Sequence, residues 1–109
     1  MDEALQVKVV SVVRVAGEVD LASAPELSSR LDALPANGNP VVVDLSEVSF
    51  IDSIGLGVLV STWTRCRESE TPTPLCLVVA TRDVERLLEV AGLRELFDVF
   101  PTLELATAW

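Results

Sequence analysis

The sequence predicts an α/β domain in which helices pack on a mixed central β-sheet. Apolar and polar residues alternate near the start of the chain, which is typical of half-buried strands. A solid β-branched run at residues 41–43 indicates a strand that is covered on both faces. Segments with helical spacing follow the buried strands, and this order favours an α/β layer. Because 109 residues suffice for one core, we expect a single domain over residues 1–109.

The first two strands are expected at residues 5–9 and 13–15, where the alternation is clearest. A weak turn signal separates them at residues 10 and 11. The second strand should close in the sequence Gly-Glu-Val-Asp, residues 17–20.

A helix should follow, and Ser23 has the position of its N-cap. Glu26 lies three residues later, as a capping box requires, and Pro25 suits a first helical turn. The pair Asn37-Gly38 is expected to end this helix. Its buried stripe should consist of Leu27, Leu31 and Leu34.

The next helix is expected to begin around Ser53, directly after an apolar strand. One of its sides should face the core, through residues that recur at helical spacing: Leu56, Leu59, Val60 and Trp63. The other side is a smooth face of mostly small residues, which are Gly57, Val58, Ser61, Thr62 and Arg65.

The last third of the chain should contain a strand at residues 75–79, a further helix and a short closing segment at 97–100. Thr81 is expected to cap that helix, and Gly92 to end it. A final short helix is expected within residues 102–109. The stripe of the helix after Thr81 should consist of Val84, Leu87, Leu88 and Ala91.

Charge and composition narrow the function. Seventeen acidic residues against eight basic ones give a net charge of −9, which repels phosphate backbones and anionic membranes. We therefore expect no direct contact with nucleic acid or membrane; a protein partner with a basic face fits better, although the charge also serves solubility. No apolar run could span a bilayer, and no basic, apolar leader precedes Leu5. These features predict a soluble, cytoplasmic domain.

The residue types that the chain lacks exclude several kinds of active site. Without histidine there is no Ser-His-Asp or Cys-His nucleophile system and no histidine metal site. Lys8 is the only lysine, and it does not follow the glycines as a phosphate-binding loop requires. Cys66 and Cys76 match no zinc spacing and are expected to be buried thiols rather than a redox pair. We therefore expect no catalytic residue, no metal and no cofactor, and a protein that is not an enzyme.

Asp52 and Ser53 stand where an apolar strand passes into a helix. Right-handed crossovers place this junction, exposed, at one edge of the sheet. A hydrolase is excluded because no base can activate the serine. A phospho-aspartate receiver with Asp44 as acceptor is discounted because no lysine follows the late strand. From the residues alone, Ser53 either simply caps the helix or belongs to a site of modification or anion binding, although Asp52 and the net charge oppose a nucleotide at Gly55–Gly57.

Residues 41–59, VVVDLSEVSFIDSIGLGVL, resemble the core of the STAS domain of bacterial anti-sigma factor antagonists. That family has an apolar strand, then Asp-Ser-Ser-Gly or Asp-Ser-Thr-Gly, then Leu-Gly and a helix. The sequence GEVD at residues 17–20 resembles the family's Gly-Glu-Leu-Asp, and VERLLEVAGLRELFDVF at 84–100 resembles its late helix and closing strand. The resemblance covers nearly the whole chain in the right order, and it implies a STAS-like fold.

The resemblance also implies a function. In such proteins the serine directly after the aspartate is phosphorylated by an anti-sigma factor that is also a serine kinase, and here that serine is Ser53. The unphosphorylated protein would bind the anti-sigma factor and release the sigma factor, whereas the phosphorylated one would not. ATP belongs to the kinase, so no cofactor is needed; a phosphatase could reset the site.

The sequence departs from the family pattern at Ile54, which replaces the second hydroxyl and leaves Ser53 as the only acceptor in the motif. A non-switching STAS module, such as a scaffold or a transport accessory, is therefore the alternative function. Asp52 should belong to the surface that the kinase recognises. Asp20 is a candidate for the same surface mainly because of the resemblance. The residues expected to bind the partner are Asp20, Asp52, Ile54, Gly55, Gly57, Val58 and Ser61.

Overall fold

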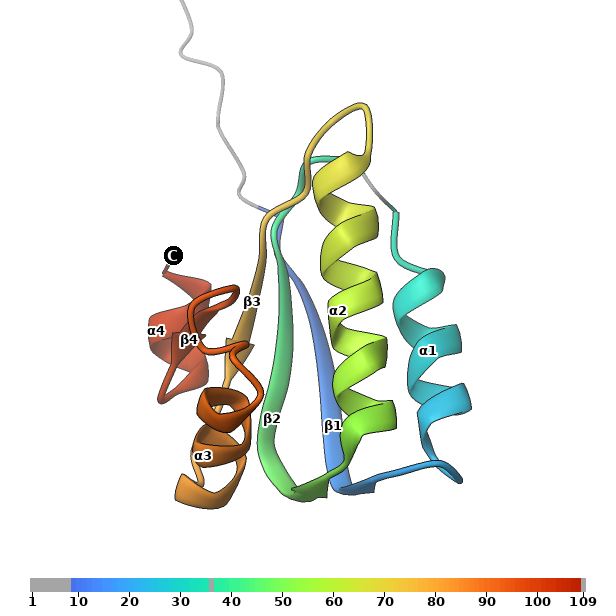
Figure 1. Cartoon of the computed structure of the whole chain (residues 1–109). Coiled ribbons are helices and arrows are strands. Elements are labelled where there is room, and N and C mark those ends of the chain that lie inside the picture. Colours follow the sequence, from blue (N-terminus) through green and yellow to red (C-terminus); the bar gives the residue numbers. More distant parts are fainter. Residues whose placement is uncertain (1–8, 36, 109) are drawn as a thin grey trace, which may run out of the picture.

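The computed structural model of the chain describes residues 9–35 and 37–108. Strands and helices alternate along these residues (Figure 1). The elements are β1 (Ser11–Val19), α1 (Ala24–Asp32), β2 (Val41–Ile51), α2 (Ser53–Glu68), β3 (Leu75–Val78), α3 (Arg82–Val90), β4 (Asp98–Phe100) and α4 (Leu103–Thr107).

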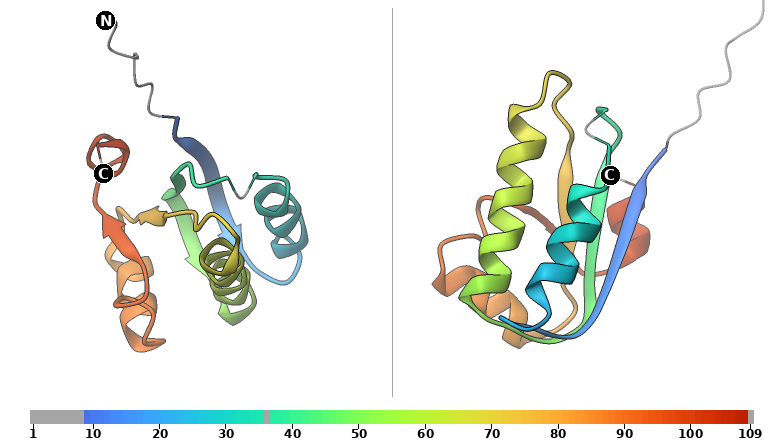
Figure 2. Two further views of the ribbon diagram at one scale, coloured as in Figure 1. Left: turned by 90° about the horizontal axis from the view of Figure 1, so that it is seen from above. Right: turned by 90° about the vertical axis from the view of Figure 1, so that its right-hand side faces the viewer.

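The four strands form one sheet in the order β1-β2-β3-β4, and every pairing among them is parallel. Helices α1, α2 and α3 lie on one face of the sheet, and α4 lies on the other, beside β3 and β4 (Figure 2). Because all four strands are parallel, α1, α2 and α3 each begin near the C-terminal ends of the strands, at the lower end of the molecule in Figure 1.

The core follows the two faces of the sheet. Val41 and Val43 point into the larger cluster, with the apolar residues of α1, α2 and α3. Val42 points into the smaller cluster, where it meets Cys76 and Ala106 of α4. A strand that alternates between two buried clusters must be apolar throughout, which explains the β-branched run in the sequence.

The α/β class expected from the sequence is confirmed, but the first strands differ. Strand β1 begins at Ser11, which pairs with Val41, so the second half of the turn expected at residues 10 and 11 already belongs to the strand. The strand expected at residues 5–9 lies outside the described residues except for Val9, which precedes β1. A mixed sheet was expected, but all the described strands are parallel to one another.

The helical stripes are largely confirmed. Leu27 and Leu31 of α1 are buried, as are Val84 and Leu88 of α3, whereas Ala91 is exposed just beyond the end of α3. Helix α1 ends at Asp32 and not at the Asn37-Gly38 pair. Pro35 explains the early end, because a proline disfavours helical backbone at the residue before it and removes an N–H donor.

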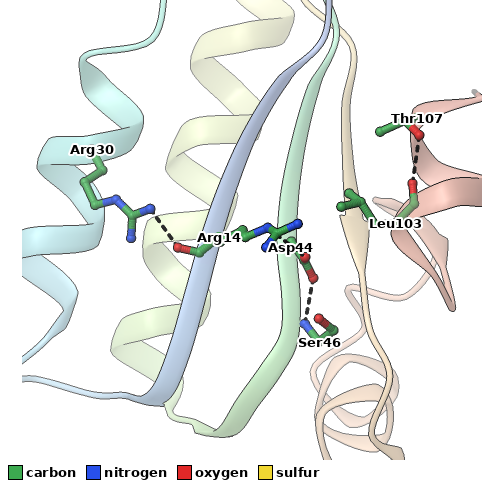
Figure 3. A network of polar contacts seen from close by, with 6 residues as sticks. All are labelled: Arg14, Arg30, Asp44, Ser46, Leu103 and Thr107. Carbon is green, nitrogen blue, oxygen red and sulfur yellow. Dashed lines mark hydrogen bonds and ion pairs between the residues drawn. The ribbon is translucent and has the colours of Figure 1, made fainter.

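Arginine side chains fix α1 to its neighbours. The guanidinium of Arg30 donates to the carbonyl oxygen of Arg14 on β1 at 2.7 Å (Figure 3), and that of Arg65 on α2 donates to the carbonyl oxygen of Leu31 at 2.6 Å. The Arg14 side chain in turn lies 3.9 Å from the buried carboxylate of Asp44. Charge-assisted bonds to main-chain carbonyls hold α1 beside both β1 and α2.

No helix in the described ranges combines the length and the apolar character that crossing a membrane requires.

Candidate functional site

The junction between β2 and α2 is organised by Asp52. Its backbone is extended, with φ −100° and ψ −175°, and its carboxylate accepts hydrogen bonds from the N–H groups of Ile54 at 3.0 Å and Gly55 at 2.9 Å. Those N–H groups belong to the first turn of α2 and have no partner within the helix. Asp52 is therefore the N-cap of α2, and its negative charge also suits the helix dipole.

This finding corrects the interpretation in which Ser53 caps the helix. Ser53 is the first residue inside α2, and its side chain is exposed. Within the described ranges, no hydrogen bond is formed by its hydroxyl group. Since Asp52 satisfies the helix terminus, the Ser53 hydroxyl is left available to a partner at the same end of the helix.

Gly55 has a packing role. It is buried, and a Cβ atom at this position would lie 2.7 Å from Cγ1 of Val19, 2.8 Å from Cγ1 of Ile51 and 3.0 Å from the carbonyl oxygen of Val19. Only glycine lets the first turn of α2 approach β1 and β2 so closely. Gly55 is expected among the partner-binding residues; it is buried, and its role in binding stays a prediction.

Asp20 organises the connection between β1 and α1. Its Oδ1 accepts from the N–H groups of Ala22 at 3.0 Å and Ser23 at 3.1 Å. The Ser23 hydroxyl donates to the carbonyl oxygen of Glu18 at 2.8 Å and accepts from the N–H of Asp20 at 3.0 Å. The capping box expected between Ser23 and Glu26 is thus not formed: Ser23 is the N-cap residue of α1, but its hydroxyl is engaged with the preceding connection.

The two connections meet each other. The N–H of Asp52 donates to the carbonyl oxygen of Val19 at 3.0 Å, directly beyond the last pair of the β1–β2 ladder, Val19 with Ile51. The structure therefore brings Asp20 and the Asp52-Ser53 pair together at one end of the molecule, where the starts of α1 and α2 lie side by side (Figures 1 and 2).

The face of α2 that was expected to consist of small exposed residues is only partly exposed. Gly57 and Ser61 are exposed, and a Cβ atom at Gly57 would meet nothing within 4 Å. Val58 is half-buried and packs against the core. Thr62 is 3% exposed, and its hydroxyl donates to the carbonyl oxygen of Val58 at 2.9 Å. The expectation for Thr62 was wrong, because α2 is covered by α1 as well as by the sheet.

The structure adds apolar residues that the sequence interpretation missed. Leu21 is 70% exposed on the connection that follows β1, and Phe50 is 45% exposed near the end of β2. Ile54, which was expected at this surface, is also 45% exposed. All three lie within two residues of Val19 or Asp52 in the sequence, and the hydrogen bond between those residues places them at the same end of the molecule.

The two cysteines lie away from this surface. Cys66 on α2 and Cys76 on β3 are both buried, as expected, and they belong to opposite sides of the sheet. Burial raises the pKa of the Cys66 thiol, and the neighbouring Arg65 guanidinium offsets part of that rise. No group of three or more His, Cys, Asp or Glu side chains in the described part of the chain could hold a metal ion.

Comparison with known proteins gives a consistent result. The family model described as the STAS domain matches residues 3–106. An anti-sigma-B factor antagonist of Bacillus subtilis is 34% identical over 87 residues, which cover 80% of this chain and 78% of that protein.

Solved structures agree with the sequence comparison. An anti-sigma factor antagonist from Mycobacterium paratuberculosis superposes with a TM-score of 0.80 at 33% identity, over 91% of this chain and 83% of that one. A sulfate transporter family protein from Wolinella succinogenes, at 22% identity, has a TM-score of 0.78 over 91% of this chain and 82% of that one. At that identity the second likeness concerns the fold alone.

Proposed function

The chain belongs to the STAS domain family, and we propose that it is an anti-sigma factor antagonist that phosphate on Ser53 switches off. Its partner is an anti-sigma factor that is also a serine kinase. The unphosphorylated chain binds this partner, which then releases its sigma factor. The single observation that carries the proposal is the exposed Ser53 hydroxyl beside the capping carboxylate of Asp52.

The chemistry belongs to the kinase. The Ser53 Oγ attacks the γ-phosphorus of ATP, a new O–P bond forms, the bond to the β-phosphate oxygen breaks, and ADP leaves. The serine proton passes to a base on the kinase, because this chain has no histidine and its Asp52 carboxylate is engaged by two N–H groups. The chain acts as a substrate and ligand, without a cofactor or a catalytic residue of its own. A phosphatase would restore the hydroxyl.

Phosphate would change the surface more than the fold. It adds about −1.5 to −2 charges at neutral pH. The start of α2 tolerates such a charge, since the helix dipole favours it by roughly 0.3–1 kcal/mol. The partner, in contrast, would have to desolvate that charge against a surface shaped for a hydroxyl. Burying an unmatched charge costs several kcal/mol, and about 1.4 kcal/mol already changes affinity tenfold.

Two substitutions at Ser53 test the switch. Ser53→Ala should bind the anti-sigma factor and resist phosphorylation, while Ser53→Asp should fold normally and bind at least about tenfold more weakly. Thr71→Asp is the matched control, because it adds the same charge on an exposed residue that lies three positions beyond Glu68, the last residue of α2. Binding is measured by calorimetry, and phosphate by intact mass after incubation with purified kinase and ATP.

A non-switching STAS module is the second candidate, favoured by Ile54 in place of the family's second hydroxyl. A partner that binds the chain firmly but never adds phosphate would support this candidate. Equal affinities of the Ala and Asp variants for that partner would exclude a charge switch at Ser53.

A further inference from the structure

We infer that Leu21 is the apolar anchor of the partner complex, and that it inserts into an apolar socket bordered by basic side chains on the anti-sigma factor. This inference rests on the proposed function and specifies the partner's surface. The anchor lies on the connection between β1 and α1, outside the Asp52-Ser53 motif itself.

Exposure singles out this end of the molecule. In the described part of the chain seven large apolar side chains are exposed. Three of them, Leu21, Phe50 and Ile54, lie within two residues in sequence of Val19 or Asp52, which are joined by a hydrogen bond. We call these three the Leu21 patch. Leu21 is the most exposed of them at 70%. Because these exposed apolar side chains occur at the end of the molecule that carries Ser53, they are candidates for contact with a protein partner.

The connection that carries Leu21 is held in one conformation. The Oδ1 atom of Asp20 accepts hydrogen bonds from the N–H groups of Ala22 and Ser23. The Ser23 hydroxyl donates a hydrogen bond to the carbonyl oxygen of Glu18. A residue on an ordered connection loses less backbone entropy on binding than one on a disordered loop. Asp20 is therefore a positioning residue, which acts on the partner through Leu21.

The negative charge near the Leu21 patch indicates which kind of partner binds there. Three carboxylates, those of Glu18, Asp20 and Asp52, lie within three residues of the patch in the sequence, and the net charge of the chain is −9. A second copy of this chain would bring the same carboxylates against one another, and nucleic acid would add phosphates. A protein surface that combines an apolar socket with Arg or Lys at its rim satisfies both features of the patch.

The probe for the test is the purified anti-sigma factor that binds the wild-type chain in the experiment above. Leu21→Ser should weaken binding at least tenfold and raise KM for Ser53 phosphorylation while leaving kcat unchanged, and Leu21→Met should retain most of the affinity. Val90→Ser is the matched control, because Val90 is 78% exposed on α3, and it should bind like the wild type. Circular dichroism should show all three variants folded.

A second pair of variants tests the positioning role. Asp20→Asn keeps an oxygen that can accept from Ala22 and Ser23, so it should retain affinity, whereas Asp20→Ala should lose it. A loss in both would assign the effect to charge and overturn the positioning role.

The outcomes separate this inference from the proposed function. If Leu21→Ser binds like the wild type while Ser53→Asp does not, the anchor is wrong and the switch stands. If Leu21→Ser weakens binding but Ser53→Ala and Ser53→Asp bind equally, the anchor stands and the switch is wrong. A concentration-dependent dimer of the wild type, lost in Leu21→Ser by analytical ultracentrifugation, would assign the patch to self-association and overturn the inference.

Discussion

The backbone N–H of Asp52 donates to the carbonyl oxygen of Val19 at 3.0 Å, so the connections that lead into α1 and α2 are bonded to each other. Val19 also packs against Gly55: a Cβ atom at Gly55 would lie 2.7 Å from Cγ1 of Val19. The start of α2, with Ser53 on it, is therefore located by β1 as well as by β2. A change in the packing beneath α2 should therefore alter the position of Ser53.

The glycines of α2 should respond oppositely to alanine. Gly55→Ala should destabilise the fold by about 1–3 kcal/mol, because its Cβ would overlap Val19 and Ile51. Gly57→Ala, two residues on in the same helix, should stabilise it by up to about 1 kcal/mol, since that Cβ meets open space. Urea unfolding of both variants measures the difference. Equal stabilities would mean that α2 does not approach β1 as described.

Two substitutions of Asp52 separate its role as the cap of α2 from the role of its charge at the surface. Asp52→Ala should cost about 0.5–2 kcal/mol of stability, because it removes the cap of α2. Asp52→Asn should cost much less, since its amide oxygen still accepts from Ile54 and Gly55. Any loss of partner affinity or phosphorylation rate in the Asn variant then reports the missing charge at the surface. If neither changes, Asp52 is a cap and is not read by the kinase.

The elements and their core faces could be predicted from the sequence because burial repeats at short, regular spacing. Leu27 and Leu31 on α1, and the run at residues 41–43, are examples in which a local pattern decides the outcome. The motif at Asp52-Ser53 was likewise visible, since it interrupts that pattern at the end of a strand.

The details of the site depended on contacts between distant residues. Asp52 and Ser53 are both good caps, and which one caps α2 is settled by where β2 stops pairing with Val19. Thr62 could not be recognised as buried, because a single stripe assumes one covered side, whereas α2 packs against both α1 and the sheet. The role proposed for Leu21 depends on the hydrogen bond between the two connections, which the sequence does not reveal.

The exposed face of α2 gives a paired prediction. Ser61→Arg should weaken binding of the anti-sigma factor without lowering Tm by more than about 2 °C, because surface substitutions rarely exceed 0.5 kcal/mol. Thr62→Arg, one residue along, should unfold the chain or lower Tm sharply, since Thr62 is 3% exposed. Scanning calorimetry together with binding separates the two cases. A Ser61→Arg variant that binds normally would place the partner elsewhere.

Cys66 should make stability fall at alkaline pH. Burial raises the pKa of its thiol in the folded chain, so the folded chain holds the proton more tightly than the unfolded one. Unfolding then releases a proton once the pH exceeds the ordinary thiol pKa, and the free energy of unfolding decreases from there upward until the raised pKa is passed. Urea titrations at pH 7.5 to 10 measure this slope, which should be smaller in Cys66→Ala. The chain contains no tyrosine or histidine, so neither residue type contributes to the slope, and comparison with Cys66→Ala isolates the part that Cys66 supplies.

Phosphate on Ser53 should leave the stability of the chain nearly unchanged. The helix dipole favours the added charge by roughly 0.3–1 kcal/mol, and repulsion from Asp52, the preceding residue, opposes it. Because the dipole and the repulsion are both screened by salt, the difference in Tm between the two forms should stay within a few degrees and shrink as salt is added. Calorimetry of the phosphorylated and unphosphorylated chains, at low and high salt, checks this. A phosphorylated form that melts far below the other would show that the modification acts by disrupting the start of α2, and not by changing the surface that the partner meets.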